Sequence, residues 1–189
     1  MAMMRKRILL GGLNMFSVHG ADSDYAAGTN DFPVTSAYQN PVMGFSFAVF
    51  TSRSFAYGLD VRYGLSASVD RRDPADEETI QADTPKNLTA VFNLYKYFVF
   101  SGRLGLYASI GGGMENLMVQ EKEYVSDLGN KIVVAAPEKT LSPLAAGGIG
   151  LQAMLSKSLG FAFDIQAAYI FRKTAQILVA PSLALVLKF

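Results

Sequence analysis

The feature that most restricts the fold of this chain is a two-residue alternation of large apolar side chains with small or polar ones. Between Phe55 and Asp70 every odd position is apolar or aromatic, and every even position is Ala, Gly, Ser, Asp or Arg. Residues 42–51, 159–172 and 176–189 show the same alternation with few exceptions. Successive side chains of a strand point to opposite faces of a sheet, so this period predicts strands with two different faces. No apolar run in the sequence reaches the roughly 18 residues that a membrane-spanning helix requires.

Alternation of this kind occurs in soluble barrels and in membrane barrels, and the sizes of the residues separate the two. A soluble barrel packs its large apolar side chains inward and exposes Lys, Glu and Thr. Here the polar positions are mostly Gly, Ala and Ser with an occasional Asp, Arg or Gln, and only 17% of the chain is charged. Small residues suit a crowded interior, and large aliphatic and aromatic residues suit a wall that faces lipid. The sequence therefore favours a membrane barrel, with a soluble barrel as the alternative.

Eight segments can be assigned as strands, each long enough for the roughly 9 to 11 residues with which a tilted strand crosses a bilayer. They are residues 7–19, 42–51, 55–70, 88–97, 103–118, 141–155, 159–172 and 176–189. Short connections follow the second, fourth and sixth segments, and long ones follow the first, third and fifth. Short turns on one side and long loops on the other are typical of outer-membrane barrels. We therefore expect an all-β protein: an eight-stranded antiparallel up-and-down transmembrane β-barrel with three long extracellular loops and short periplasmic turns.

The beginning of the chain admits a second interpretation, because basic residues followed by an apolar stretch are typical of a secretory signal peptide. Bacterial single-chain barrels have an even number of strands, and removing residues 7–19 would leave an odd number. We therefore expect residues 7–189 to form a single transmembrane barrel domain and residues 1–6 an N-terminal extension. The signal peptide that exports such a protein is then not evident in this numbering.

The pattern of the whole chain resembles a known family. The eight alternating segments, the run Leu106–Gly113 and the ending Leu183–Phe189 are similar to those of small outer-membrane β-barrels of the OmpX and OmpA transmembrane-domain type. This resemblance implies a bacterial outer-membrane location and contact with outer-membrane lipids and lipopolysaccharide. It implies no single activity, because adhesins, resistance factors and anchors all occur in the family.

The end of the chain carries the most specific part of this resemblance. Apolar residues at alternate positions lead up to a phenylalanine, at Leu183, Leu185, Leu187 and Phe189. This arrangement is similar to the signal that the barrel-assembly machinery recognises, which implies an assembly role and makes that machinery a partner during biogenesis. Earlier in the same segment, Pro181 has no amide hydrogen for a ladder bond. We expect a bulge or an unpaired carbonyl there.

Composition excludes several classes of function. The chain has no cysteine and a single histidine, His19, so it cannot build a Cys/His zinc site, a disulfide framework or a thiol nucleophile. The formal charge of +1 provides no overall field that would gather a polyanion, so nucleic acid is not expected as a partner. No cofactor and no metal site are expected.

Charged and amide side chains occur at a few positions of the face that we expect to line the lumen. In an eight-stranded barrel the interior is just wide enough for side chains. We expect these groups to pair and fill the lumen, and a path for protons or solutes is the alternative. The residues are Asp60, Arg62, Asp164, Gln166, Arg172 and Lys188.

The long connections offer two further features. The acidic connection 70–87 lacks the spacing of an EF-hand, and we interpret it as a solvated loop. Binding of calcium or of the divalent ions that bridge lipopolysaccharide is the alternative. In the third long connection, residues 126–130 read as the tip of a hairpin, whose apolar flanks could bind a partner by strand addition. His19, Ser68 and Asp70 are expected near the extracellular rim, and together they suggest a lipid-modifying enzyme. No nucleophile motif accompanies them.

From these features we expect a non-enzymatic outer-membrane barrel with a structural or surface-interaction role. It would act through its long extracellular loops or as a subunit of an outer-membrane complex, with another membrane or surface protein as partner. A narrow channel for small solutes and a lipid-modifying barrel enzyme are the alternatives.

Overall fold

The computed structural model describes residues 6–19, 38–52, 54–66, 68–72, 79–83, 86–99, 103–118, 122–129, 131–134, 141–171 and 176–188. Eight strands in these ranges form one closed barrel. They are β1 (Lys6–His19), β2 (Tyr38–Phe50), β3 (Phe55–Gly64), β6 (Lys86–Val99), β7 (Leu104–Met118), β10 (Leu141–Met154), β11 (Leu159–Ile170) and β12 (Gln176–Lys188). Among the described residues, no helix is long and apolar enough to cross a membrane.

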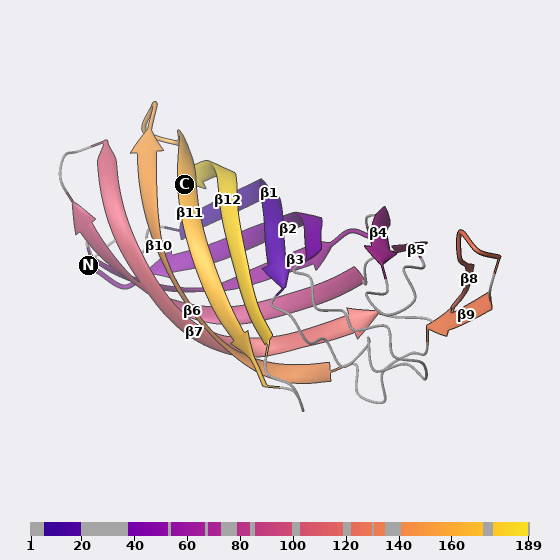
Figure 1. Ribbon diagram of the computed structural model, residues 1–189. Helices are drawn as coiled ribbons and strands as arrows, with labels where there is room; N and C mark the ends of the chain where they lie inside the picture. Colours follow the sequence, from indigo (N-terminus) through magenta and orange to yellow (C-terminus); the bar gives the residue numbers. More distant parts are fainter. Residues whose placement is uncertain are drawn as a thin grey trace.

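The barrel has up-and-down topology, because each strand pairs antiparallel with its neighbours along the chain. Closure comes from β1, which pairs with β2 on one side and with β12 on the other (Figure 1). The connections after β2, β6 and β10 are short and lie at one end, which we call the short-turn end. The connections after β1, β3 and β7 are long and leave from the opposite end, the long-loop end. The fold expected from the sequence is confirmed.

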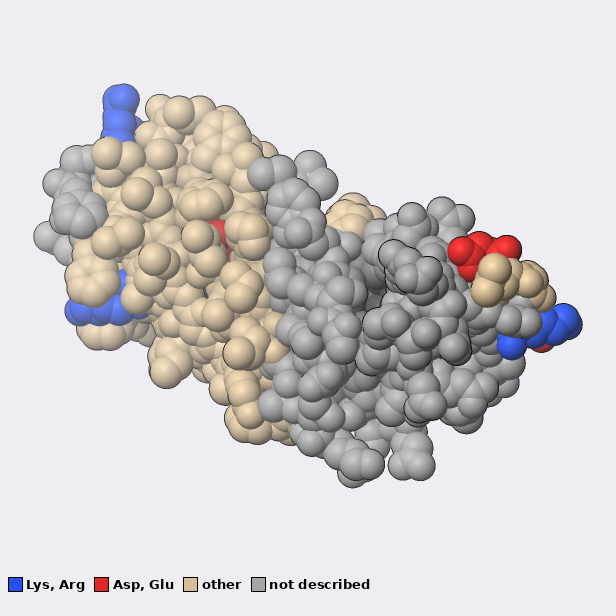
Figure 2. All heavy atoms as spheres, viewed as in Figure 1, with Lys and Arg blue, Asp and Glu red and all other residues tan. Residues whose placement is uncertain are grey.

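The wall of the barrel is apolar outside and mixed inside. In β11, Phe161 and Phe163 are 44% and 49% exposed, whereas Ala162 between them is 1% exposed. The same alternation holds in β3 and β10. Figure 2 shows this outer wall as an almost uninterrupted uncharged surface. A barrel with exposed large apolar side chains and a partly polar interior is the inverse of a soluble barrel, so the soluble alternative is wrong.

Two short hairpins stand outside the barrel sheet at the long-loop end. β4 (Ser68–Arg72) pairs with β5 (Thr79–Asp83), and β8 (Lys122–Val125) pairs with β9 (Lys131–Val134). The second hairpin confirms the tip expected at residues 126–130, where the amide of Gly129 donates to the carbonyl of Ser126. The first corrects two expectations, because the third barrel strand ends at Gly64 rather than Asp70 and because the acidic connection contains a hairpin. β3 ends there because Gly64 pairs with Asn87, next to the start of β6, and beyond it the chain pairs with itself.

The register of β1 shifts by one residue at two places, against both neighbours. Leu9 pairs with Ser46, but Gly12 pairs with Gly44, so three residue steps of β1 face two of β2. A second shift follows Asn14, and on the β12 side it spans the stretch from Ser182 to Val179. Pro181 lies in that stretch, while its ladder with β11 is regular at Ile165. The bulge expected at Pro181 is therefore confirmed, on the side of β1.

Candidate functional site in the barrel lumen

Asp60 of β3 points into the lumen and is 3% exposed. Its carboxylate accepts two hydrogen bonds from β6. The Asn93 amide donates from Nδ2 to Oδ2 at 2.6 Å, and the Tyr95 hydroxyl donates to Oδ1 at 2.8 Å. Short hydrogen bonds to a carboxylate are among the stronger ones in proteins, so Asp60 is held by neutral donors on the adjacent strand.

A second carboxylate joins opposite walls of the barrel. Asp164 lies on β11 and Arg62 on β3, and these two strands are four places apart in either direction around the closed sheet. Their side chains meet across the lumen, with 3.7 Å between Arg62 Nη2 and Asp164 Oδ1. The hydroxyl of Tyr107, from β7, donates to Asp164 Oδ2 at 3.1 Å. The cross-section of the barrel is therefore bridged by side chains at this level.

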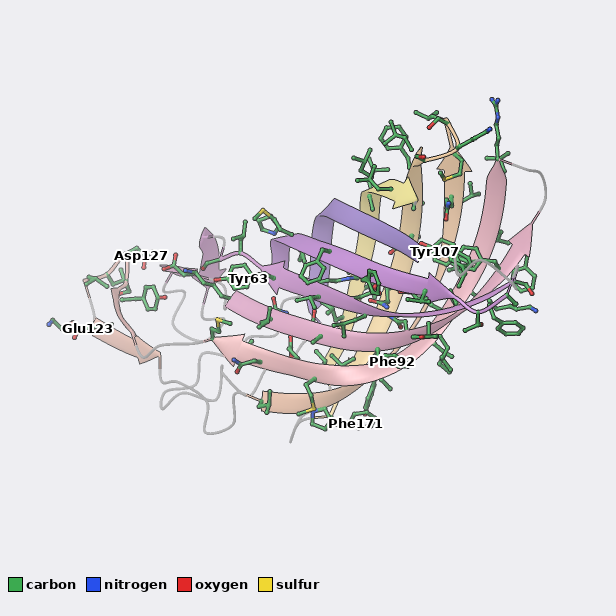
Figure 3. All side chains as sticks on the ribbon, turned by 180° about the vertical axis from the view of Figure 1, so that it is seen from behind. Tyr63, Phe92, Tyr107, Glu123, Asp127 and Phe171 are labelled. Atoms are coloured by element: carbon green, nitrogen blue, oxygen red, sulfur yellow. The ribbon has the colours of Figure 1, made fainter. Side chains whose placement is uncertain are left out.

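Tyrosine rings fill the lumen between this bridge and the short-turn end. Tyr95, Tyr97 and Tyr107 are all buried, and their ring centroids lie 5.1 to 6.4 Å apart. Phe50 of β2 extends the cluster, 4.9 Å from Tyr97. Tyr107 lies inside the barrel, whereas Phe92 and Phe171 point outward (Figure 3). We call Phe50, Tyr95, Tyr97 and Tyr107 the aromatic plug.

Glycine on a neighbouring strand makes room for one ring of the plug. Tyr107 pairs with Gly150 of β10, and a Cβ at Gly150 would overlap the outer atoms of the tyrosine ring. Because Gly150 also pairs with Asp164, the ring can cross β10 and reach the carboxylate on β11.

The lumen nearer the long-loop end holds another polar pair and an apolar cluster. Glu115 of β7 is fully buried, and its Oε1 accepts a hydrogen bond of 2.7 Å from Nδ2 of Asn87. The apolar cluster is formed by residues of β6, β10, β11 and β12 and comprises Val91, Leu144, Ala146, Ala168, Ile170 and Leu178. Described side chains therefore enter the lumen both here and in the aromatic plug.

Two asparagines of β6 also lie against glycines. The Oδ1 atoms of Asn87 and Asn93 have no hydrogen-bond partner among the described atoms. A Cβ at Gly64 would overlap the first of these oxygens, and one at Gly111 would overlap the second. Each oxygen therefore lies over the Cα of a glycine, where a weak Cα–H···O contact is the interaction available to it.

The structure brings together part of the polar set expected from the sequence. Arg62 meets Asp164, while Asp60 binds asparagine and tyrosine, and Gln166 is buried in the wall of the lumen. Arg172 and the side chain of Lys188 lie outside the described residues.

Sequence reasoning missed the tyrosines and the buried Glu115. The sequence of β6 contains one indication of the inward tyrosines. Tyr95 and Tyr97 occupy odd positions, on the same face as the polar residues Asn87, Thr89 and Asn93.

The three residues on which the enzyme alternative rests lie in two different elements. His19 ends β1, where its backbone pairs with Tyr38 and Leu178. Ser68 and Asp70 lie in β4, which belongs to the separate hairpin and not to a barrel strand. The side chains of these three residues lie outside the described set. Among the residues that are described, no group of three acidic or histidine side chains could hold a metal ion.

The two projecting hairpins touch each other. The backbone amide of Asp83, at the end of β5, donates to the hydroxyl of Tyr124 in β8 at 3.3 Å. Within the second hairpin, Lys131 and Glu123 form an exposed ion pair of 2.7 Å. Val125 and Leu128, at the tip, are 62% and 67% exposed. These elements form a surface beyond the barrel wall.

The residues expected to act in assembly are partly described. Leu183 and Leu185 point outward from β12, and Leu187 is half-buried. Phe189 lies outside the described residues, so the assembly role stays a prediction.

Neither a family model nor a curated protein sequence matches this chain. Several solved structures are similar to it in fold. Neisserial surface protein A has a TM-score of 0.61 at 7% identity, over 98% of this chain and 97% of that one. OprG, an outer-membrane protein of Pseudomonas aeruginosa, has 0.53 at 14% identity, over 98% and 96%. Ail, the attachment invasion locus protein of Yersinia pestis, solved with the heparin analogue sucrose octasulfate, has 0.51 at 13% identity over the whole of both chains.

These likenesses cover almost the full length of each protein and follow the closed eight-stranded topology found here. At such low sequence identity they concern the fold. The chain has the fold of the small eight-stranded outer-membrane β-barrels.

Proposed function

We propose that this chain is an integral outer-membrane barrel that acts at the cell surface through its long connections, while its lumen is a closed structural core. The observation that carries the proposal is the filling of the lumen. The Arg62–Asp164 bridge joins opposite walls, and the aromatic plug occupies the space below it. An eight-stranded barrel has room for side chains but not for an open channel as well.

The outer surface supports the membrane location. Its exposed aliphatic and aromatic side chains match a wall in contact with outer-membrane lipid. In barrels of this type the short turns face the periplasm and the longer loops face outward. That orientation directs the hairpins β4–β5 and β8–β9 to the cell exterior, where lipopolysaccharide and surface proteins are the available partners. The solved neighbours include Neisserial surface protein A and Ail, the attachment invasion locus protein.

We do not expect this chain to bind a polyanion such as the heparin analogue found with Ail. The long connections, residues 20–37, 65–85 and 119–140, contain thirteen of the sixteen acidic residues and five of the seventeen basic ones. An excess of negative charge repels a polyanion. A cationic or neutral partner fits this surface better.

We assign no catalytic role, since the residues of the enzyme alternative are divided between a barrel strand and a separate hairpin.

The closed lumen predicts a clear electrical result. We expect the refolded protein to insert into planar bilayers without stepwise conductance. The triple variant Arg62→Ser/Tyr97→Ala/Tyr107→Ala removes the bridge and two rings of the plug, so it should give small ohmic steps. Heat-modifiable gel migration checks that both proteins are folded. Steady single-channel steps from the wild-type protein would instead favour the solute-channel alternative.

The surface role is tested by capture of partners from native outer membranes. We expect partners of the wild-type protein to be lost when residues 122–134 are replaced by a Gly-Ser linker. They should be retained by Arg62→Met/Asp164→Leu, a lumen variant with intact loops. Equal retention by both variants would contradict a role for the β8–β9 hairpin.

A further inference from the structure

The short-turn end of the barrel carries seven of the seventeen basic residues of this chain. Three of them have described side chains there: Lys96 near the end of β6, Arg103 before β7, and Lys157 in the turn after β10. Figure 2 shows Lys and Arg atoms at that end of the molecule, on the left. The start of β1, the turn after β2 and the end of β12 contribute further positions. We call the set the cationic rim: Lys6, Arg7, Arg53, Lys96, Arg103, Lys157 and Lys188.

Acidic residues do not accompany this rim. The sequence has none in residues 1–21, 32–59, 84–114, 139–163 or 165–189, which include every strand end and turn at the short-turn end. The acidic side chains of β3 and β11, Asp60 and Asp164, point into the lumen and bind donors there. The chain as a whole has a formal charge of only +1. The short-turn end therefore has an excess of positive charge, whereas the basic residues of the long-loop end are outnumbered by acidic ones.

The same pair of serine hydrogen bonds occurs in two of the short turns. In the turn Ser156-Lys157-Ser158, the Ser156 hydroxyl oxygen accepts hydrogen bonds from the amides of Ser158 and Leu159, at 3.2 and 3.0 Å. In the turn after β2, the Ser52 hydroxyl oxygen accepts from the amides of Ser54 and Phe55, at 3.3 and 3.1 Å. The sequence of that turn is Ser52-Arg53-Ser54, so Arg53 corresponds in sequence to Lys157.

Lys96 shows how the rim meets the apolar wall. Its side chain lies on the outer face of β6, and its Nζ is 3.9 Å from the centre of the Phe55 ring. Phe55 is itself 51% exposed on that face. A lysine whose stem lies along an apolar surface and whose ammonium reaches the edge of it is typical of a membrane interface. This cation therefore lies at the depth where lipid head groups begin.

We propose that the cationic rim binds the phosphate groups of anionic phospholipids in the leaflet at the short-turn end, and so sets the depth of the barrel. The inference rests on the proposed function, which places this end at the periplasmic leaflet. Lys and Arg form charge-assisted hydrogen bonds with phosphate, and clusters of them attract anionic lipid surfaces. In the sequence, every short turn has a member of this set within it or next to it, and so do both strands of the β1–β12 seam.

The test measures lipid selectivity around the full-length barrel. The protein is refolded in phosphatidylcholine vesicles that contain spin-labelled phosphatidylglycerol or spin-labelled phosphatidylcholine, and electron paramagnetic resonance gives the association of each with the protein. We expect phosphatidylglycerol to be favoured about fivefold or more at low salt. The preference should fall towards one in 1 M NaCl, where charges are screened.

Matched variants locate the selectivity. Lys96→Gln/Arg103→Gln/Lys157→Gln should abolish most of the preference, and Lys86→Gln/Lys122→Gln/Lys131→Gln, at the long-loop end, should retain it. Lys157→Gln alone, in an exposed turn, should lower the preference for phosphatidylglycerol. This single variant tests the proposal if the rim triple variant does not fold. A preference that is absent in the wild type, insensitive to salt or lost only in the long-loop variant would overturn the proposal.

Heat-modifiable gel migration of each sample distinguishes failure of the cationic rim proposal from failure of the proposed membrane barrel. Failure of the wild-type protein to insert would refute the proposed membrane barrel. Normal insertion without lipid selectivity would refute the cationic rim alone.

Discussion

Replacing Arg62 with methionine lowers the free energy of unfolding of the barrel by about 3 to 5 kcal/mol, because it leaves a buried carboxylate without its cation. The two side chains are only 10% and 17% exposed, so solvent screens the charge of Asp164 weakly. Loss of the bridge also leaves Tyr107 as the remaining described donor to that carboxylate. Urea unfolding of the refolded protein in detergent micelles measures the change.

Two control variants make this result specific. Arg62→Met/Asp164→Leu removes both charges and should recover most of the stability, as is found when a buried ion pair is replaced by apolar residues. Lys131→Met breaks the exposed pair with Glu123, which at 2.7 Å is the shorter of the two. It should cost less than about 1 kcal/mol, since exposed pairs contribute little. If Arg62→Met and Lys131→Met cost the same, the bridge does not carry the stability assigned to it.

Gly113→Ala prevents stable folding or lowers the free energy of unfolding by about 3 kcal/mol or more, the upper range for overpacking. Gly113 lies on β7 opposite Val91, and a Cβ there would meet the carbonyl oxygen of Ala90 and lie 2.8 Å from the Cα of Val91. Both atoms belong to the backbone of β6, so the new methyl group cannot be accommodated by rotating a side chain.

The adjacent glycine supplies the control. Gly112 points outward, and the nearest atom to a Cβ there is the carbonyl oxygen of Leu144 at 3.6 Å, an ordinary contact. Gly112→Ala should therefore leave refolding yield and unfolding midpoint unchanged within error. If both variants folded equally well, close approach of the strands would not explain why β7 has glycine at residue 113.

Alternation predicted the barrel strands well where each strand keeps one register. Phe55 to Gly64 and Leu159 to Ile170 pair regularly on both sides, so their period of two is intact in the sequence. In β1 the two register shifts each add a residue, and a single period over residues 7–19 cannot describe such a strand. The stretch from Ser68 to Asp70 also continues the alternation of β3, because a strand has the same period whichever partner it pairs with.

The content of the lumen was only partly predictable. Asp60, Arg62 and Asp164 stand out as charges on an otherwise small-residue face, and that contrast is present in the sequence. The contact between Arg62 and Asp164 depends on which strands lie opposite each other, which requires the register of the closed sheet. The inward tyrosines conflict with the expectation of small interior residues, and they fit only because Gly150 leaves space for Tyr107.

The independent pairing of the two hairpins has a consequence for how the surface of this protein can vary. Among the described strands, β4 pairs only with β5 and β8 only with β9, and a hydrogen bond from the Asp83 amide to the Tyr124 hydroxyl joins the two hairpins. No ladder connects either hairpin to the barrel sheet in the described ranges. Insertions and replacements in these segments are therefore free to accumulate without altering strand pairing beneath them. The barrel can serve as a carrier on which new surface sequences are exchanged, in evolution or by grafting.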